Sequence, residues 1–318
     1  MTSWVEKYRP TTLDSIVAQT NVIVALKKVL ITKNLPNLLF FGPSGCGKTS
    51  TIIALSKELF GDMYSERVIE LNASDERGIN VIREKIKTYA KKSINMKEGS
   101  PPWKIIILDE ADNMTIDSQF ALRRIMEEYS KITRFCIICN YHNKIIDPIN
   151  SRCALFRFKP IKEKEIINKL ESICINEKFV YSDSILNQIF NLCRGDLRKA
   201  INFLQKCYSS FGSVLDQNVL DEISGRIPKD VICKLLEAIE TKNSIVMDNM
   251  VETITNNGYS LVNMISFFDN YIKTSSFSSK TKSLLSILLT EIDNDLLKGS
   301  DEYIEFMKLV YNFANIIS

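Results

Sequence analysis

The sequence predicts an α/β fold in which a parallel sheet carries helices on both faces and is followed by all-helical segments. Short apolar runs alternate with helical patterns over about the first 160 residues, and a glycine-rich loop, GPSGCGKT (42–49), joins the first run to the first helical pattern. This alternation is typical of parallel sheets, because neighbouring parallel strands need a crossover connection, usually a helix. From about residue 161 onward the patterns are helical only.

Five apolar runs are expected to be strands, and three amphipathic patterns are expected to be helices between them. The runs are almost continuously apolar, which is typical of strands buried on both faces of a sheet. The helical patterns space their apolar residues by three and four, as Ile52, Leu55 and Leu59 do. We expect strands at 37–42, 67–74, 104–112, 134–140 and 154–160, and helices at 49–61, 78–92 and 117–130.

The chain is expected to divide into three domains. The α/β domain is assigned to residues 1–160, a small helical domain to 161–225 and a second helical domain to 226–318. Ser182 and Asp196 precede helical patterns in the second domain and are expected to be N-caps. The stretch SGRIP (224–228) contains a Gly and a Pro and is expected to be the linker.

Composition limits the class of protein. The 318 residues are 45% hydrophobic and 25% charged, which is ordinary for a globular protein. A net charge of +3 does not by itself indicate nucleic-acid binding, so positive charge for such binding must be concentrated locally. The N-terminus lacks the apolar core of a secretion signal, and no run of about 18 uncharged apolar residues occurs, so we expect no membrane partner. The eight cysteines fit a reducing compartment, the cytosol or the nucleus.

Cys136 and Cys139 form a C-x-x-C pair, a pattern that occurs in metal and redox sites. They lie in the run RFCIICN, and residues three apart in a strand point to opposite faces of the sheet. No second cysteine pair follows at the spacing of a zinc site, and His142 is the only histidine. We therefore expect both cysteines to pack in the core.

The loop GPSGCGKT fits the phosphate-binding motif G-x-x-x-x-G-K-[ST] and stands between a strand and a helix, as this motif requires. Its glycines let backbone N–H groups point at phosphates, and the helix N-terminus adds partial positive charge. Lys48 is expected to reach the β- and γ-phosphates of ATP, and Thr49 to offer its hydroxyl to Mg²⁺. The expected nucleotide-binding residues of this stretch are Gly42, Pro43, Ser44, Gly45, Cys46, Gly47, Lys48, Thr49 and Ser50.

Two later apolar runs of the α/β segment, at 104–112 and 134–140, end in polar residues. Asp109 is expected to hold Mg²⁺, mainly through water. Glu110 is expected to orient and deprotonate an attacking water, which is the role that hydrolysis requires. Asn140 could reach the γ-phosphate or that water, with a turn-forming asparagine as the alternative. The combination predicts an ATP hydrolase.

Eight stretches carry a resemblance to a known family. WVEKYRP, LDSIVAQ, LNASDERGI, KIIILDEADNMT, ALRRIMEEYS, RFCIICNY, IIDPINSRC and GDLRKAIN occur in this order. Together they resemble the sequence boxes of the small subunits of replication factor C, the eukaryotic clamp loader of the AAA+ class. The resemblance runs from residue 3 to about residue 230, and the rest matches only as a helical segment of suitable length.

The resemblance implies an AAA+ domain, a helical lid and a helical collar for the three expected domains. It implies an ATPase subunit of a heteropentamer that opens the sliding clamp and loads it onto primer-template DNA, in replication and repair, in the nucleus. It also implies that Val5, Arg9 and Val17 surround the adenine and ribose. Asn140 then corresponds to the sensor 1 residue and Arg198 to the sensor 2 arginine of the lid, although Arg198 alone would be taken as a solvated helix residue.

Arg152, in the stretch NSRC, has several interpretations from the residues alone. It could form a surface salt bridge, contact a DNA phosphate, or act as a catalytic cation for a site built elsewhere. The resemblance implies the last, an arginine finger that acts in trans on a neighbour's nucleotide. We expect Arg152 to have no local partner.

The helix expected at 78–92 places Arg83, Lys87 and Lys91 four apart, on one face. A solvated basic face is the alternative to a surface that tracks DNA phosphates. The resemblance implies DNA contact by this helix, especially by Arg83 and Lys87. The roles of Arg77, Arg123 and Arg124 stay open between DNA contact and coupling of Glu110 to a neighbour.

Two other classes of P-loop protein compete with this interpretation. A self-sufficient AAA+ DNA-remodelling motor or helicase would need pore loops, and no Gly-aromatic-Gly loop occurs in the sequence. A kinase of small molecules would not account for LNASDERGI or for SRC. The clamp-loader subunit is the function that accounts for these stretches together.

Overall fold

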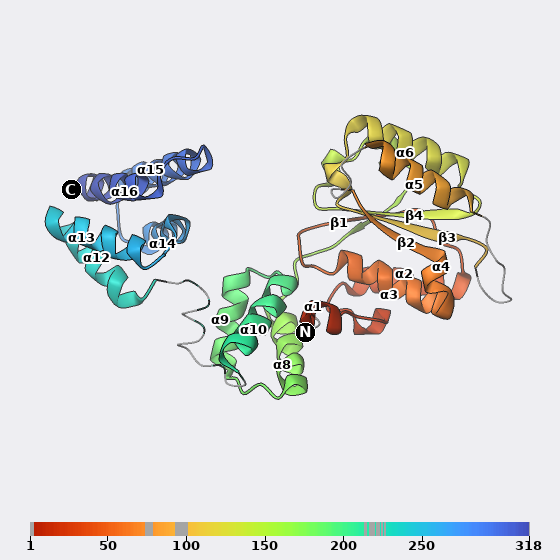
Figure 1. Ribbon diagram of the computed structural model, residues 1–318, viewed down its shortest axis with the longest axis horizontal. Helices are drawn as coiled ribbons and strands as arrows, with labels where there is room; N and C mark the ends of the chain where they lie inside the picture. The colour runs from red at the N-terminus through yellow and green to blue at the C-terminus, as the bar shows by residue number, and fades with distance from the viewer. Residues whose placement is uncertain are drawn as a thin grey trace. The chain divides into compact units, whose positions relative to one another are not determined.

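The computed structural model describes residues 3–73, 79–92, 101–212 and 227–317, with the isolated positions 215, 220, 223 and 225. The chain forms two compact units, Met1–Leu215 and Asp216–Ser318 (Figure 1). The predicted fold class, an α/β unit with helical segments after it, is confirmed. The division at residues 160 and 225 stays a prediction, since the first two expected domains both fall largely in the first unit.

In the described part of the first unit, five strands form one sheet in the order β2-β3-β4-β1-β5. Every neighbouring pair is parallel. The strands are β1 (Leu38–Phe41), β2 (Val68–Asn72), β3 (Lys104–Asp109), β4 (Thr133–Cys139) and β5 (Ala154–Arg157). All five expected strands are thereby confirmed. The order places the carboxyl ends of β1, β4 and β3 side by side, at the edge where sheets of this type bind ligands.

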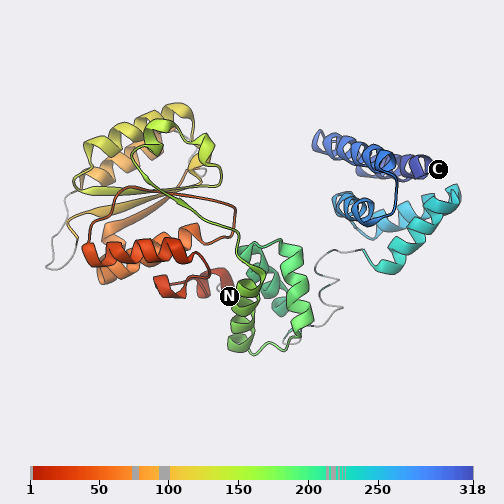
Figure 2. The same cartoon turned by 180° about the vertical axis from the view of Figure 1, so that it is seen from behind.

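Helices cover both faces of the sheet, as Figures 1 and 2 show. One face carries α2 (Thr20–Thr32), α3 (Lys48–Phe60) and the short α4 (Tyr64–Arg67), and the other carries α5 (Ile79–Lys91) and α6 (Ile116–Glu128). Alternate residues of each strand belong to two apolar cores. Phe40 and Ile107 pack on the side of α2 and α3, and Leu39 and Ile106 pack on the side of α5 and α6. The strand period of two explains why both sets are apolar.

Cys136 and Cys139 are buried in the two cores on opposite faces of the sheet. The expected role in core packing is confirmed. Burial raises the pKa of the Cys139 thiol to about 12 and the pKa of Cys136 well above its usual value. Both thiols are therefore protonated at neutral pH and unreactive as nucleophiles.

Three helices complete the first unit after the sheet: α8 (Glu163–Glu177), α9 (Asp183–Cys193) and α10 (Leu197–Phe211). Asp196 caps α10 by accepting a hydrogen bond from the Lys199 amide at 3.0 Å, as expected. Ser182 occupies the N-cap position of α9, but its hydroxyl pairs with that of Ser184 rather than with the helix backbone. The remaining short elements are α1 (Trp4–Lys7), α7 (Asp147–Asn150) and the 3-10 turns Leu13–Ser15, Gly61–Met63, Ala111–Asn113 and His142–Lys144.

The N-terminal helix α1 is docked on these three helices. The Trp4 amide donates to Gln205 Oε1 at 2.8 Å, and the Trp4 ring lies 5.2 Å from the ring of Tyr208. Glu177 of α8 accepts from Tyr8 at 2.6 Å and from Lys7 at 2.5 Å. The chain segment around Val5 and Arg9 is therefore fixed between the helices and the sheet.

The second unit is helical throughout its described part. Its helices are α12 (Lys229–Thr241), α13 (Ser244–Asn256), α14 (Leu261–Thr274), α15 (Ser279–Leu297) and α16 (Glu302–Ile317). Phe268, Phe306 and Phe313 are fully buried and form the centre of a separate apolar core. Within the described ranges, no helix combines the length and apolar character that a bilayer crossing requires.

Candidate active site

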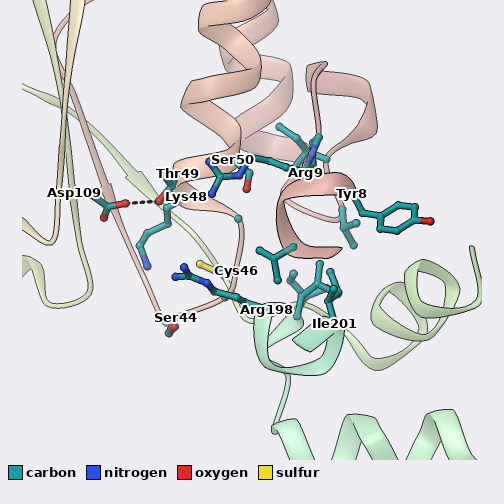
Figure 3. Close-up of a pocket in the computed structure, with 18 of the residues that line it drawn as sticks. Tyr8, Arg9, Ser44, Cys46, Lys48, Thr49, Ser50, Asp109, Arg198 and Ile201 are labelled. Carbon is teal, nitrogen blue, oxygen red and sulfur yellow. Dashed lines mark hydrogen bonds between the residues drawn. The ribbon is translucent and has the colours of Figure 1, made fainter. Parts of the chain in front are cut away.

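A cavity of about 340 Å³ lies at the carboxyl edge of the sheet. The glycine-rich loop, the segment around Arg9 and the helices α8 and α10 contribute its walls (Figure 3). It contains most of the residues that the sequence predicts for nucleotide binding. They are Val5, Arg9, Val17, Ser44, Gly45, Cys46, Gly47, Lys48, Thr49, Ser50, Asp109, Glu110, Asn140 and Arg198.

Two glycines of the loop are required by close packing. A Cβ atom on Gly42 would lie 2.4 Å from the carbonyl oxygen of Phe158. One on Gly45 would lie 2.0 Å from Oδ1 of Asp196, and Gly45 also has a φ of +66°, which side-chain-bearing residues seldom adopt. The loop therefore passes directly beneath the first turn of α10, and its backbone faces the cavity.

Lys48, the first residue of α3, is folded back over the loop. Its ammonium group donates to the carbonyl oxygens of Gly42 and Pro43, each at 2.8 Å, and to Oδ1 of Asn140 at 2.9 Å. Gly42 and Pro43 contact Lys48 in this way and do not line the cavity. The structure thus brings together Lys48, at the start of α3, and Asn140, directly after β4.

Thr49 and Asp109 meet across the same edge. The Thr49 hydroxyl donates to Asp109 Oδ2 at 2.6 Å, while Asp109 Oδ1 accepts from the Glu110 amide at 2.8 Å. A hydroxyl and a carboxylate are hard oxygen donors of the kind that Mg²⁺ prefers. The chemistry of this donor pair fits the expected magnesium site.

Glu110 directly follows β3 and has a left-handed backbone conformation, with φ of +53°. Such a conformation is costly for a residue with a side chain and is concentrated at functional sites. Glu110 lines the cavity, and Asn113 Nδ2, which lies outside the lining, donates to its Oε2 at 3.4 Å. Glu110 and Asn140 both line this cavity.

The cavity also includes residues that the sequence did not single out. Tyr8, Pro10, Ile16 and Ile201 add an apolar wall, and Glu70, Asn72, Ile161, Lys169 and Leu197 line it too. Glu70 is exposed by surface area, and partial desolvation by its surroundings raises the pKa of its carboxyl. A sequence signal existed for Glu70, because it is a charged residue inside a strand run that is otherwise apolar. No comparable signal distinguishes Lys169 on α8.

Arg152 does not line the cavity. It stands between α7 and β5, where its NH2 group lies 2.6 Å from Oε1 of Glu127 and its NH1 donates to the Pro148 carbonyl oxygen at 2.7 Å. The expectation that Arg152 has no local partner is therefore wrong. Glu127 lies on α6, which packs next to α7, so the contact depends on tertiary structure that the sequence pattern did not predict.

The basic helix α5 is described in part. Lys87 and Lys91 are exposed. The side chain of Arg83, and Arg77 as a whole, lie outside the described residues. Of the two arginines on α6, Arg124 is exposed and Arg123 pairs with Glu127 at 3.6 Å.

Three family models match successive parts of the chain. Residues 38–161 match the ATPase family associated with various cellular activities. Residues 168–209 match the AAA+ ATPase lid domain of the RCF1/5-like type, and residues 227–312 match the replication factor C C-terminal domain. The three matches follow one another in the order in which the sequence places its α/β and helical parts.

Individual relatives cover nearly the whole chain. Replication factor C subunit 2 of Schizosaccharomyces pombe is 44% identical over 317 residues, covering 98% of this chain and 93% of the relative. The replication factor C small subunit of Saccharolobus solfataricus is 42% identical over 313 residues, covering 98% and 94%. This level of similarity supports the clamp-loader interpretation over that of a self-sufficient motor.

A likeness to a solved structure concerns the fold alone. The Thermotoga maritima RuvB Holliday junction branch migration motor matches 74% of this chain and 80% of its own, with a TM-score of 0.54 and 15% sequence identity. It shows that the two chains share a fold over that part. Given the relatives, the family models and the phosphate loop, the chain is an AAA+ ATPase that belongs to the small-subunit family of replication factor C.

Proposed function

We propose that this chain is an ATP-hydrolysing subunit of a heteropentameric clamp loader that opens a sliding clamp and places it on primer-template DNA. The observation that carries the proposal is the cavity at the sheet edge, in which Lys48, Thr49, Asp109, Glu110 and Asn140 converge. The names of the relatives support assembly with other replication factor C subunits. The proposed site of action is the nucleus, which the likeness to the Schizosaccharomyces pombe subunit supports.

The proposed binding mode of ATP follows from the charges and the shape of the cavity. Phosphate oxygens replace the carbonyl oxygens that now hold Lys48, and loop N–H groups and the α3 N-terminus add further donors. The adenine and ribose lie by Val5, Arg9 and Val17, against the apolar wall. Arg198 of α10 contacts the phosphates as the cation of the lid.

Hydrolysis requires a positioned water and a base for its proton. Asn140 orients the water by hydrogen bonding, and Glu110 accepts the proton. Thr49 and Asp109 would hold Mg²⁺, Asp109 mainly through water, and the ion would neutralise charge on the phosphates. Arg152 is assigned to the neighbouring subunit's site, where a guanidinium can stabilise charge that develops in the transition state.

The assembly is tested by co-purification. A tagged version of this chain is expected to bring down the other replication factor C subunits and, in the presence of ATP, a sliding clamp. The Lys48→Ala variant should keep the subunits but lose the ATP-dependent clamp, because assembly through the C-terminal helices does not need the phosphate loop. Recovery of this chain as a homo-oligomer without other subunits would contradict the proposal.

DNA contact is assigned to α5. The Lys87→Glu variant, alone and with Arg83→Glu, is expected to weaken DNA-stimulated ATP hydrolysis and to lower its dependence on salt, because contacts to phosphates release counterions. The measurement is the ATPase rate of the complex against DNA concentration at two salt concentrations. Lys28→Glu, an exposed charge reversal on α2, is the matched control. An unchanged DNA response would remove α5 from the DNA-binding surface.

A further inference from the structure

Glu127 stands at the centre of a small charged cluster outside the nucleotide cavity. Its Oε1 atom lies 2.6 Å from NH2 of Arg152 and 3.6 Å from Nε of Arg123. Arg123 and Glu127 are one helical turn apart on α6, whereas Arg152 comes from the segment between α7 and β5. Two arginines therefore share one carboxylate oxygen, and only one of them is at hydrogen-bonding distance.

The Arg152 guanidinium has both of its terminal nitrogens engaged within its own chain. NH2 faces Glu127, and NH1 donates to the Pro148 carbonyl oxygen at 2.7 Å and lies 3.4 Å from the Ser151 hydroxyl. A guanidinium binds phosphate through the same terminal N–H groups, often in pairs. Each terminal nitrogen carries two N–H groups, so a neighbour's phosphate would compete with Glu127 and Pro148 for the same two nitrogens.

We propose that Glu127 is a positioning residue that holds Arg152 on its own subunit until nucleotide in the neighbouring site withdraws it. The inference rests on the proposed action of Arg152 in trans. The carboxylate competes with the phosphates of the neighbour for the same cation.

Arg123 lowers the free-energy cost of breaking the contact between Arg152 and Glu127. When Arg152 leaves, the Glu127 carboxylate still has an ion-pair partner, because Arg123 is already within ion-pair distance of the same oxygen. The Nε atom of Arg123 is buried and lacks a hydrogen-bond partner in the described structure, so a small movement of Glu127 toward it would satisfy that group. The cluster thus has two arrangements that differ by which arginine Glu127 binds.

The strength of the contact suits a switch rather than a permanent bond. Arg152 and Glu127 side chains are 39% and 42% exposed, and exposed ion pairs are weak. A weak restraint lowers the population of the free arginine only modestly when no strong anion competes. The multiply charged phosphates of bound ATP, together with correct subunit geometry, are sufficient to overcome it.

The test uses the complete clamp loader with Glu127→Gln in this chain. ATP hydrolysis without clamp or DNA is expected to rise by about two- to fivefold, the range that follows from a surface ion pair. The rate stimulated by clamp and DNA should stay unchanged, because in that state Arg152 has already left Glu127 for the phosphates in the neighbouring site. The isosteric Glu128→Gln change on the same helix is the control, since Glu128 contacts Tyr129 instead. Glu127→Asp, which keeps the charge, should restore a basal rate closer to that of the unmodified complex.

The outcomes separate this inference from the proposed function beneath it. If Arg152→Ala removes hydrolysis but Glu127→Gln leaves the basal rate unchanged or lowers it, the restraint by Glu127 is wrong and the trans action of Arg152 stands. If Arg152→Ala leaves hydrolysis intact, the trans action itself fails. The double variant Glu127→Gln, Arg152→Ala should behave as Arg152→Ala, and any basal increase that survives in it would contradict the inference.

Discussion

The Arg152→Ala variant is expected to lose ATP hydrolysis at the neighbouring subunit's site while this chain still binds ATP at its own. Arginine fingers in other nucleotide hydrolases contribute about 10³–10⁵ to the rate, so the neighbour's site should fall to a level near background. Arg152 is outside the cavity of its own chain, which is why binding there should not change.

The measurement needs a complex in which only one site can turn over. The phosphate-loop lysines of every subunit except this chain and the neighbour are replaced, and Glu110→Gln stops turnover in this chain, so that the neighbour's site supplies the whole signal. Nucleotide binding to this chain is followed with a fluorescent analogue. Arg157→Ala removes an exposed arginine from β5 nearby and is the control. If the isolated chain hydrolyses ATP well and loses that activity with Arg152→Ala, the arginine acts in cis.

The sequence predicted the strands of the sheet and the residues that converge on the cavity because both depend on local patterns. Apolar runs mark the strands, the phosphate loop follows β1, and polar residues stand at the ends of β3 and β4. A parallel sheet then places those ends together, so Lys48, Asp109 and Asn140 converge although they are far apart in the chain. The phosphate loop adds a motif whose spacing is fixed by the chemistry of phosphate binding.

The contacts that the sequence missed are made between elements whose relative rotation no local pattern specifies. Glu127 and Arg152 lie on different elements, and their pairing depends on how α6 packs against α7. Lys169 reaches the cavity only because α8 returns toward the sheet after β5. Both residues look like ordinary surface charges in the sequence, and the surface is where such residues are most often found.

The second large effect is expected from Glu110→Gln. This variant should bind ATP as well as the unmodified chain but hydrolyse it slower by about 10²–10⁴, the contribution of a positioned general base. Glutamine keeps the size of the side chain and an oxygen that can accept from Asn113, so the local structure is retained. Only the capacity to take up the proton of the attacking water is lost.

Single-turnover hydrolysis in the assembled complex separates this loss from an effect on binding. The complex that carries Glu110→Gln should retain ATP and remain in its clamp-binding state, whereas Glu66→Gln, an exposed change on α4, should hydrolyse normally. A rate within tenfold of the unmodified complex would show that Glu110 is not the base. Glu70 would then be the next carboxylate to replace, because it lines the same cavity and desolvation raises the pKa of its carboxyl.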